Sequence, residues 1–225
     1  KVALSLLEGQ DVPADYRRRL EDWKVRSPVV KFNAALTAMP EWTAAPGETW
    51  PARATIDVTG GLEDAQRAFE ACERGEPAVG FGEVYIQTGY DATPAPAGKH
   101  LLSVFGQYAP YDLAEGTWDS RREEVARQFI DLIDRFAPGF DERIEAYEVL
   151  GPPDIEQRIG LTGGNIFQGE VTPDQMWEHR LTPRTPVPGL YFCGAATHPG
   201  GSVIALNGRN AAMAVLADAR ELAAR

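Results

Sequence analysis

The spacing of apolar residues predicts several amphipathic helices. In the segment DSRREEVARQFIDLIDRFAPG, at 119–139, apolar side chains recur every three or four residues. Ser120 and Glu123 fit a capping box at its start, and Pro138-Gly139 fit its end. Further helices are expected as two short segments within 1–24, at 62–75, and at 152–160, where proline opens the helix.

Other segments show the alternation or β-branched content that is typical of strands. A stretch at 39–60 that is rich in proline and glycine is expected to be irregular. The expected strands lie at 27–36, 79–88, 99–109 and 143–150. The order of strands and helices, with neighbours that look antiparallel, predicts an α/β (α+β) fold with a mixed sheet and helices on one face.

The C-terminal pattern is different. The run LYFCGAATHPGGS, at 190–202, predicts a short buried strand followed by a glycine-rich loop, and an Ala-rich helix follows the loop. Ser202 fits the N-cap of that helix, whose free N–H groups would attract an anion. Gly208, Ala211 and Ala212 form a small-residue face that permits close packing. Strand, glycine loop and helix can form a nucleotide site, but a purely packing role would use similar residues.

Composition narrows the class of protein. The 225 residues carry a net charge of −11, which argues against a nucleic-acid surface, and 44% are hydrophobic, as in soluble globular proteins. No segment has the roughly 20 apolar residues that span a bilayer. Cys72 and Cys193 are too few for a disulfide scaffold or a zinc site, and we expect reduced, mostly buried thiols.

Candidate chemistry concentrates at 151–212. Residues 1–160 contain no nucleophile elbow, metalloprotease motif or phosphate-binding lysine loop, and no metal site is expected. A glycine-rich loop contains Gly163, Gly164, Asn165 and Phe167. It brings the backbone close either to another loop or to a flat ligand.

Several stretches together resemble a known family. APAGKHLLSVFGQYAPY, FAPGFDERI, PPDIEQRIGLTGGNIFQGE, TPVPGLYFCGAATHPGG and GRNAA follow one another at intervals similar to those in the C-terminal half of FAD-dependent oxidoreductases related to phytoene desaturases. The most similar branch is phytoene dehydrogenase-like. The resemblance extends over nearly the whole chain.

The resemblance implies a substrate-binding domain at 1–186 and a segment at 187–225 that closes a split Rossmann-type FAD domain over the flavin. It implies that the loop at 163–167 faces the flavin or the substrate and that His198 is the titratable group nearest the flavin. We expect His198 to position the loop, with proton transfer as the alternative role. The residues that would line FAD are Gly194, Thr197, His198, Pro199, Gly200, Gly201, Ser202 and Val203.

The chain departs from the family pattern in one large respect. It begins with Lys1, and the N-terminal GxGxxG fingerprint of the family does not occur in it. We therefore expect a C-terminal portion, whether truncated, cleaved or half of a split enzyme, that is inactive alone. Its expected partners are the N-terminal FAD-binding half, an apolar small molecule and, through an exposed docking face, a second copy. A cytoplasmic location is expected. The alternative is a non-catalytic interaction module that binds no flavin.

Overall fold

The computed structural model describes every residue except 27–28, 202 and 225. The chain forms two compact units, one made of Lys1–Arg26 with Asn165–Arg225 and the other of Ser27–Gly164. We call them unit 1 and unit 2. This division differs from the expected boundary between 186 and 187, which concerns function and stays a prediction.

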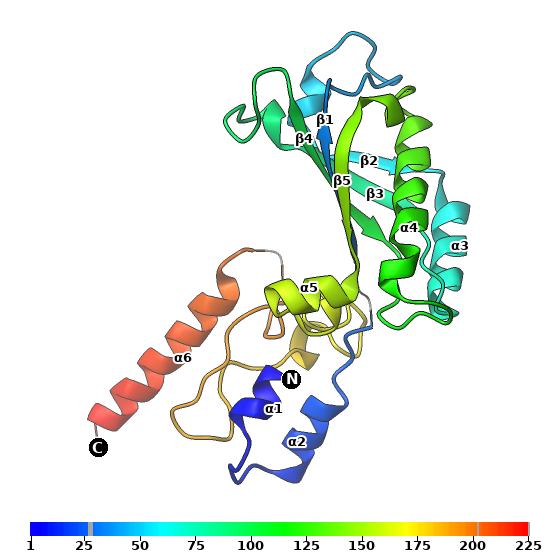
Figure 1. Ribbon diagram of the computed structural model, residues 1–225. Helices are drawn as coiled ribbons and strands as arrows, with labels where there is room; N and C mark the ends of the chain where they lie inside the picture. Colours follow the sequence, from blue (N-terminus) through cyan, green and yellow to red (C-terminus); the bar gives the residue numbers. More distant parts are fainter. Residues whose placement is uncertain (27–28, 202, 225) are drawn as a thin grey trace. The chain divides into compact units, whose positions relative to one another are not determined.

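Unit 2 is built on a five-stranded sheet in the order β2-β3-β4-β1-β5 (Figure 1). Its strands are β1 (Val30–Leu36), β2 (Ile56–Thr59), β3 (Phe81–Ile86), β4 (His100–Gln107) and β5 (Ile144–Leu150). All the pairs are antiparallel, so the expected mixed sheet is wrong in strand direction. Four of the strands match expected segments, whereas β2 lies inside the stretch that was expected to be irregular.

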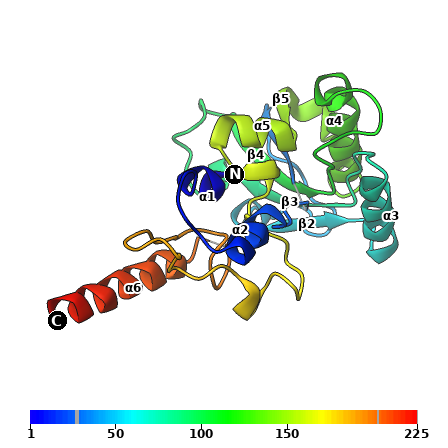
Figure 2. The same cartoon turned by 90° about the horizontal axis from the view of Figure 1, so that it is seen from below.

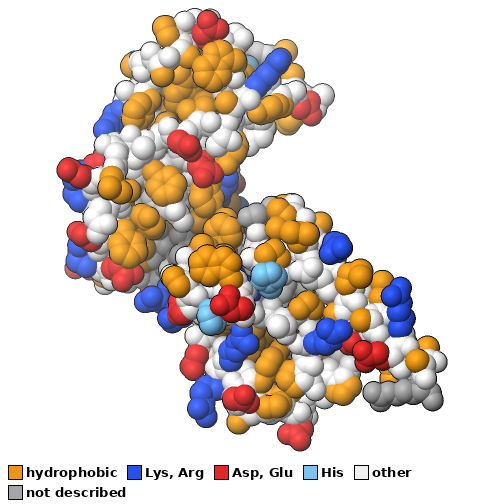
Figure 3. Space-filling model, turned by 180° about the vertical axis from the view of Figure 1, so that it is seen from behind, with side chains coloured by type: hydrophobic (Ala, Val, Ile, Leu, Met, Phe, Trp, Pro, Cys, Tyr) orange, Lys and Arg blue, Asp and Glu red, His pale blue; other side chains and the backbone are white. Residues whose placement is uncertain are grey.

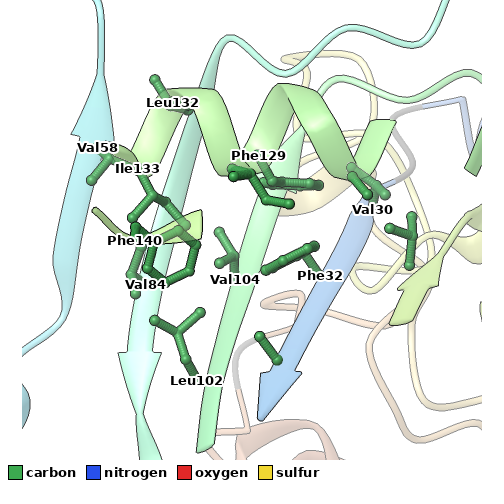
Figure 4. Packing of buried hydrophobic residues seen from close by; sticks show 14 of the residues in the cluster. Val30, Phe32, Val58, Val84, Leu102, Val104, Phe129, Leu132, Ile133 and Phe140 are labelled. Carbon is green, nitrogen blue, oxygen red and sulfur yellow. The ribbon is translucent and has the colours of Figure 1, made fainter. Parts of the chain in front are cut away.

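Two helices, α3 (Leu62–Glu73) and α4 (Trp118–Asp134), lie on the same side of the sheet (Figures 1 and 2). The core lies between α4 and the sheet, where Phe129 and Ile133 meet Phe32, Val84 and Val104 (Figure 4). The Phe32 and Phe129 rings stack with centroids 5.4 Å apart. The expected helices on one face are therefore present.

The start of α4 differs in detail from expectation. Thr117 is the N-cap and forms the capping box with Ser120, where Ser120 and Glu123 were expected. After β5 the chain forms α5 (Pro152–Ile159), opened by proline as expected. Short 3₁₀ segments complete unit 2 at Trp50–Arg53, Gln87–Gly89, Asp141–Arg143 and Thr162–Gly164.

Unit 1 has little regular structure besides its helices. These are α1 (Val2–Leu6), α2 (Ala14–Glu21), the 3₁₀ turn Trp177–His179 and α6 (Leu206–Ala223). The expected strand at 190–193 is wrong, because Tyr191 makes only an isolated bridge to Arg184 in the described part of the chain. A strand needs a partner along its length, and unit 1 does not supply one there. No helix in the described ranges combines the length and apolarity needed to cross a lipid bilayer.

Candidate functional site

The glycine loop, residues 194–201, folds into consecutive turns in unit 1. Gly194 and Gly200 have φ angles of 115° and 116°, which residues other than glycine rarely adopt. The Thr197 N–H donates to the Gly194 carbonyl at 3.0 Å, and the Gly200 N–H donates to the Thr197 carbonyl at 2.8 Å. A Cβ added at Gly194 would meet nothing within 4 Å, so backbone is exposed there. The loop is thus a defined backbone surface and not a disordered connection.

Two asparagines tie this loop to α6. The Asn207 amide donates to the Thr197 carbonyl at 2.8 Å and to its hydroxyl oxygen at 3.2 Å, and both residues are buried. Asn210 donates to the His198 carbonyl at 3.2 Å. Because buried polar groups need partners, these bonds fix the loop against the first turns of the helix.

The start of α6 lies later than the sequence indicated. The helix begins at Leu206, with Ala205 at its N-cap. Ser202, the expected N-cap and a predicted FAD contact, lies outside the described residues. Val203 is fully exposed, and Pro199 continues the loop after His198.

The structure divides the second predicted loop between the two units. Gly163 and Gly164 belong to unit 2, where a Cβ at Gly164 would lie 2.6 Å from the Pro152 Cα. Asn165 and Phe167 belong to unit 1, where the Phe167 N–H donates to Asn165 Oδ1 at 2.9 Å. Close packing against Pro152 within unit 2 therefore explains why glycine stands at position 164.

Phe167 is brought against the glycine loop. A Cβ on Gly201 would lie 3.1 Å from Phe167 Cδ1 and 3.5 Å from the Ala195 Cβ. Asn165 is fully buried. Half of the second predicted loop and the whole glycine loop are therefore neighbours in one unit.

Arg180 lies directly beside these loops and was not among the residues predicted from the sequence. Its side chain is 1% exposed, and its Nη1 and Nη2 donate to the carbonyls of Phe167 and Gly169 at 3.2 Å and 3.4 Å. A Cβ on Gly200 would lie 3.6 Å from Arg180 Nε. The Arg180 guanidinium carbon lies over the Trp23 ring, 5.9 Å from the ring centroid. The sequence signal is weak: Arg180 stands in WEHRLTP, outside the acid-rich runs that contain many other arginines.

His198 is exposed, and its ring is oriented by one hydrogen bond. Its Nδ1 lies 2.9 Å from the Trp177 carbonyl oxygen. Because a carbonyl only accepts, Nδ1 carries the proton in this arrangement. The bond holds the loop to the 3₁₀ turn Trp177–His179. His100 belongs to unit 2, so it is not part of this site.

A groove of about 620 Å³ in unit 1 adjoins the site. His198 and Asn210 reach it from the glycine loop and α6, and Arg180 reaches it from the preceding segment. The other lining residues are Trp177, Glu178, Thr182, Pro183, Arg184, Met213 and Ala214.

Unit 2 has its own groove on the sheet face that α4 does not cover. Its volume is about 360 Å³, and Ala35, Leu101 and Ala146 supply apolar walls. Asn33 donates to Glu148 at 3.4 Å, and Gln87 donates to Ser103 at 2.7 Å along the same face. The groove therefore combines apolar surface with polar groups that already have partners.

Neither cysteine belongs to these sites. Both are free, Cys72 half-buried and Cys193 exposed, so the expected burial is wrong for Cys193. Burial, with Glu73 nearby, raises the pKa of the Cys72 thiol to about 11. Cys72 is therefore a poor nucleophile near neutral pH.

No known family profile matches the chain. Pyridine nucleotide-disulfide oxidoreductase domain-containing protein 2 of Rattus norvegicus is 36% identical over 97% of the chain and 40% of its own length. The Mus musculus protein of that name matches equally. A limonene dehydrogenase subunit of Castellaniella defragrans is 29% identical over 69% of the chain and 30% of its own length.

These similarities place the chain in an oxidoreductase family. It belongs to the family of pyridine nucleotide-disulfide oxidoreductase domain-containing protein 2, and it corresponds to the C-terminal part of that protein. The resemblance seen in the sequence is thereby confirmed at the level of the family. The chain spans about two-fifths of the length of these relatives.

Proposed function

We propose that this chain is the C-terminal portion of an FAD-dependent oxidoreductase of the desaturase, dehydrogenase or amine-oxidase type. In this proposal it forms the substrate cavity and closes a split Rossmann-type domain over the flavin. The observation that carries the proposal is the convergence in unit 1 of the glycine loop, Phe167 and the buried guanidinium of Arg180. A loop with exposed backbone at Gly194 and a positive charge beside Gly200 suits a flat ligand with anionic groups.

The residues fit FAD on two observations. A Cβ at Gly194 would find open space, so a ligand can approach the backbone there. Arg180 Nε is buried and has no hydrogen-bond partner in the described residues. The predicted contacts Gly194, Thr197, Gly200 and Gly201 would hold the cofactor. When bound, flavin supplies the chemistry of accepting a hydride from a substrate C–H bond.

The chain's own residues would position and enclose the reactants. Thr197 and Asn207 hold the loop backbone, and His198 fixes the loop through its bond to the Trp177 carbonyl. The groove of unit 2 would take an apolar part of the substrate. The name of the limonene dehydrogenase relative supports an apolar hydrocarbon substrate, while carotenoid-like polyenes, other lipids and amines also fit.

The exposed face of α6 supports docking of the N-terminal, FAD-binding part of the family's full-length proteins. Gly208, Ala212, Val215 and Leu216 follow helical spacing, and all are exposed. Apolar side chains lie at the surface along α6 (Figure 3). Exposed apolar surface of this kind marks an interaction site and explains why isolated chains are expected to self-associate.

Flavin absorbance tests the proposal. The chain is purified alone and together with the N-terminal half of the full-length protein, and visible spectra are recorded. We expect a yellow complex that releases FAD on denaturation, and weak or no FAD binding by the chain alone. A stable but colourless complex would instead support the alternative, a non-catalytic interaction module that docks through α6.

A further inference from the structure

Arg180 carries a positive charge that is buried inside unit 1. In the described residues its side chain makes no ion pair, and its Nε has no hydrogen-bond partner. The partners of the other two nitrogens are neutral: the carbonyls of Phe167 and Gly169 and, at 3.7 Å, the Met176 sulfur. Removing a charge from water without a counter-charge is costly.

One buried acid acts on this charge without contacting it. Glu170 favours the charged form of Arg180, but the two side chains form no ion pair, and the Glu170 carboxylate accepts a hydrogen bond from the Arg26 N–H. Burial is the larger influence and lowers the pKa of Arg180. Because an arginine keeps its proton at any physiological pH, the charge persists inside unit 1.

The surrounding structure holds the guanidinium in one place. A Cβ on Gly169 would lie 2.4 Å from Arg180 Nη1 and 2.8 Å from Trp23 Nε1, so a side chain cannot occupy that position. Trp23 is itself fixed, since its Nε1 donates to the Gln168 carbonyl at 2.9 Å. Arg19 donates to the His179 carbonyl at 2.7 Å and anchors the backbone just before Arg180.

The unpartnered nitrogen faces the glycine loop. Gly200 is the loop residue in contact with it, and without a Cβ it brings only backbone against the guanidinium. A fixed cation therefore lies against the buried part of the glycine loop at Gly200. Arginine in this position is suited to oxygen anions.

We propose that Arg180 is the counter-charge for an anionic group of the ligand seated on the glycine loop. That this ligand is FAD comes from the proposed function, and the inference rests on it in this respect. Two anionic groups share this chemistry: the diphosphate, and the N1–C2=O region of the reduced flavin. Arg180 acts as an electrostatic and positioning residue in either case.

The first experiment tests the anion site without flavin. Thermal unfolding of the chain is measured with inorganic pyrophosphate or with chloride at matched ionic strength. We expect pyrophosphate to raise the unfolding temperature of the unmodified chain and not that of Arg180→Met. Arg184→Met is the matched control, because Arg184 lines the same groove but is already paired with Asp218 at 2.7 Å.

The second experiment uses the full-length protein and separates the two anions. If the diphosphate is held, Arg180→Met binds oxidised FAD about tenfold to a hundredfold more weakly. If the reduced flavin is held, affinity for oxidised FAD is unchanged and the midpoint potential becomes more negative. Arg180→Lys keeps the charge and should retain part of either effect, which also covers failure of the Met variant to fold.

The outcomes separate this inference from the proposed function. If the Arg180 variants keep both the FAD affinity and the flavin midpoint potential of the unmodified protein, the inference is overturned and the proposed function is unaffected. Stabilisation by pyrophosphate that depends on Arg180, in a full-length protein without FAD, supports the anion site and overturns the flavin proposal. Equal stabilisation of the unmodified, Arg180→Met and Arg184→Met chains would show an adventitious ion only.

Discussion

Asp154 joins two helices of unit 2 through one carboxylate. Arg122 of α4 contacts it with two nitrogens, at 2.6 Å and 2.7 Å, and the Gly151 N–H at the start of α5 donates to it at 2.8 Å. We predict that Asp154→Asn lowers the free energy of unfolding by about 1.5–3 kcal/mol, the range for hydrogen bonds to charged groups. Urea unfolding at pH 7 measures the difference.

The same carboxylate predicts a pH dependence. Arg122 is the main cause that holds the pKa of Asp154 below its usual range. Its contribution is therefore fully present above the unfolded pKa of about 3.9 and is lost as pH falls through the lower folded pKa. The stabilities of the unmodified and Asp154→Asn proteins should converge in acid. Glu124→Gln, which breaks an exposed pair with Arg121, should change little at either pH.

His198 yields a further prediction at the scale of single residues. Its Nδ1–H bond to the Trp177 carbonyl can be replaced by a glutamine amide but not by alanine. In the full-length protein we expect His198→Ala to lower FAD content and His198→Gln to restore much of it. If both variants kept their FAD and lost turnover per bound flavin equally, His198 would instead transfer a proton.

Single residues also show what a sequence can reveal about a site. Glycines at 194 and 200 are visible in the sequence because their positive φ angles select glycine itself. Gly201 belongs to the same run, and a Cβ there would crowd Phe167. Arg180 cannot be recognised in this way, since its importance comes from burial among segments that lie far apart in sequence. The partner of Thr197, Asn207, was likewise found only in the structure.

The contact between α4 and the sheet depends on glycine at one position of β4. A Cβ on Gly106 would lie 2.4 Å from the Phe129 ring, which is itself fully buried. We predict that Gly106→Ala lowers the free energy of unfolding by about 1–3 kcal/mol through overpacking. Denaturant unfolding measures it. Adding Phe129→Leu should recover part of the loss; strictly additive losses would contradict the steric explanation.

Helices and strands were predictable from the sequence where the periodic segment is long or where apolar and polar residues alternate regularly. The helix α4 has a long periodic pattern, and burial alternates along β1, β3 and β4. The strand β5 was also predicted, although its burial does not alternate. β2 has only four residues within a stretch of turn-forming residues, so its pairing with β3 had no local signal. Strand direction is set by which strands pair, and periodicity does not encode it; the sheet was therefore expected to be mixed and is antiparallel.

At the scale of the whole molecule, the two units leave different surfaces exposed. Unit 2 covers one face of its sheet with α3 and α4 and has a continuous core. Unit 1 has a small core around Leu7, Leu20 and Leu181, and its α6 exposes apolar side chains. A helix with exposed apolar residues is expected to gain stability from a partner.

Leu216 tests whether α6 docks the N-terminal part of the full-length protein. Its side chain is 50% exposed, so Leu216→Glu should leave the stability of this chain nearly unchanged. If the docked helix buries Leu216, the same change should weaken association of the two separately expressed parts by tenfold or more. Calorimetric titration measures the affinity, and Glu221→Gln on the same helix is the matched control. Equal affinities for the unmodified and Leu216→Glu chains would remove this face of α6 from the docking surface and move the search to the other exposed surfaces of unit 1.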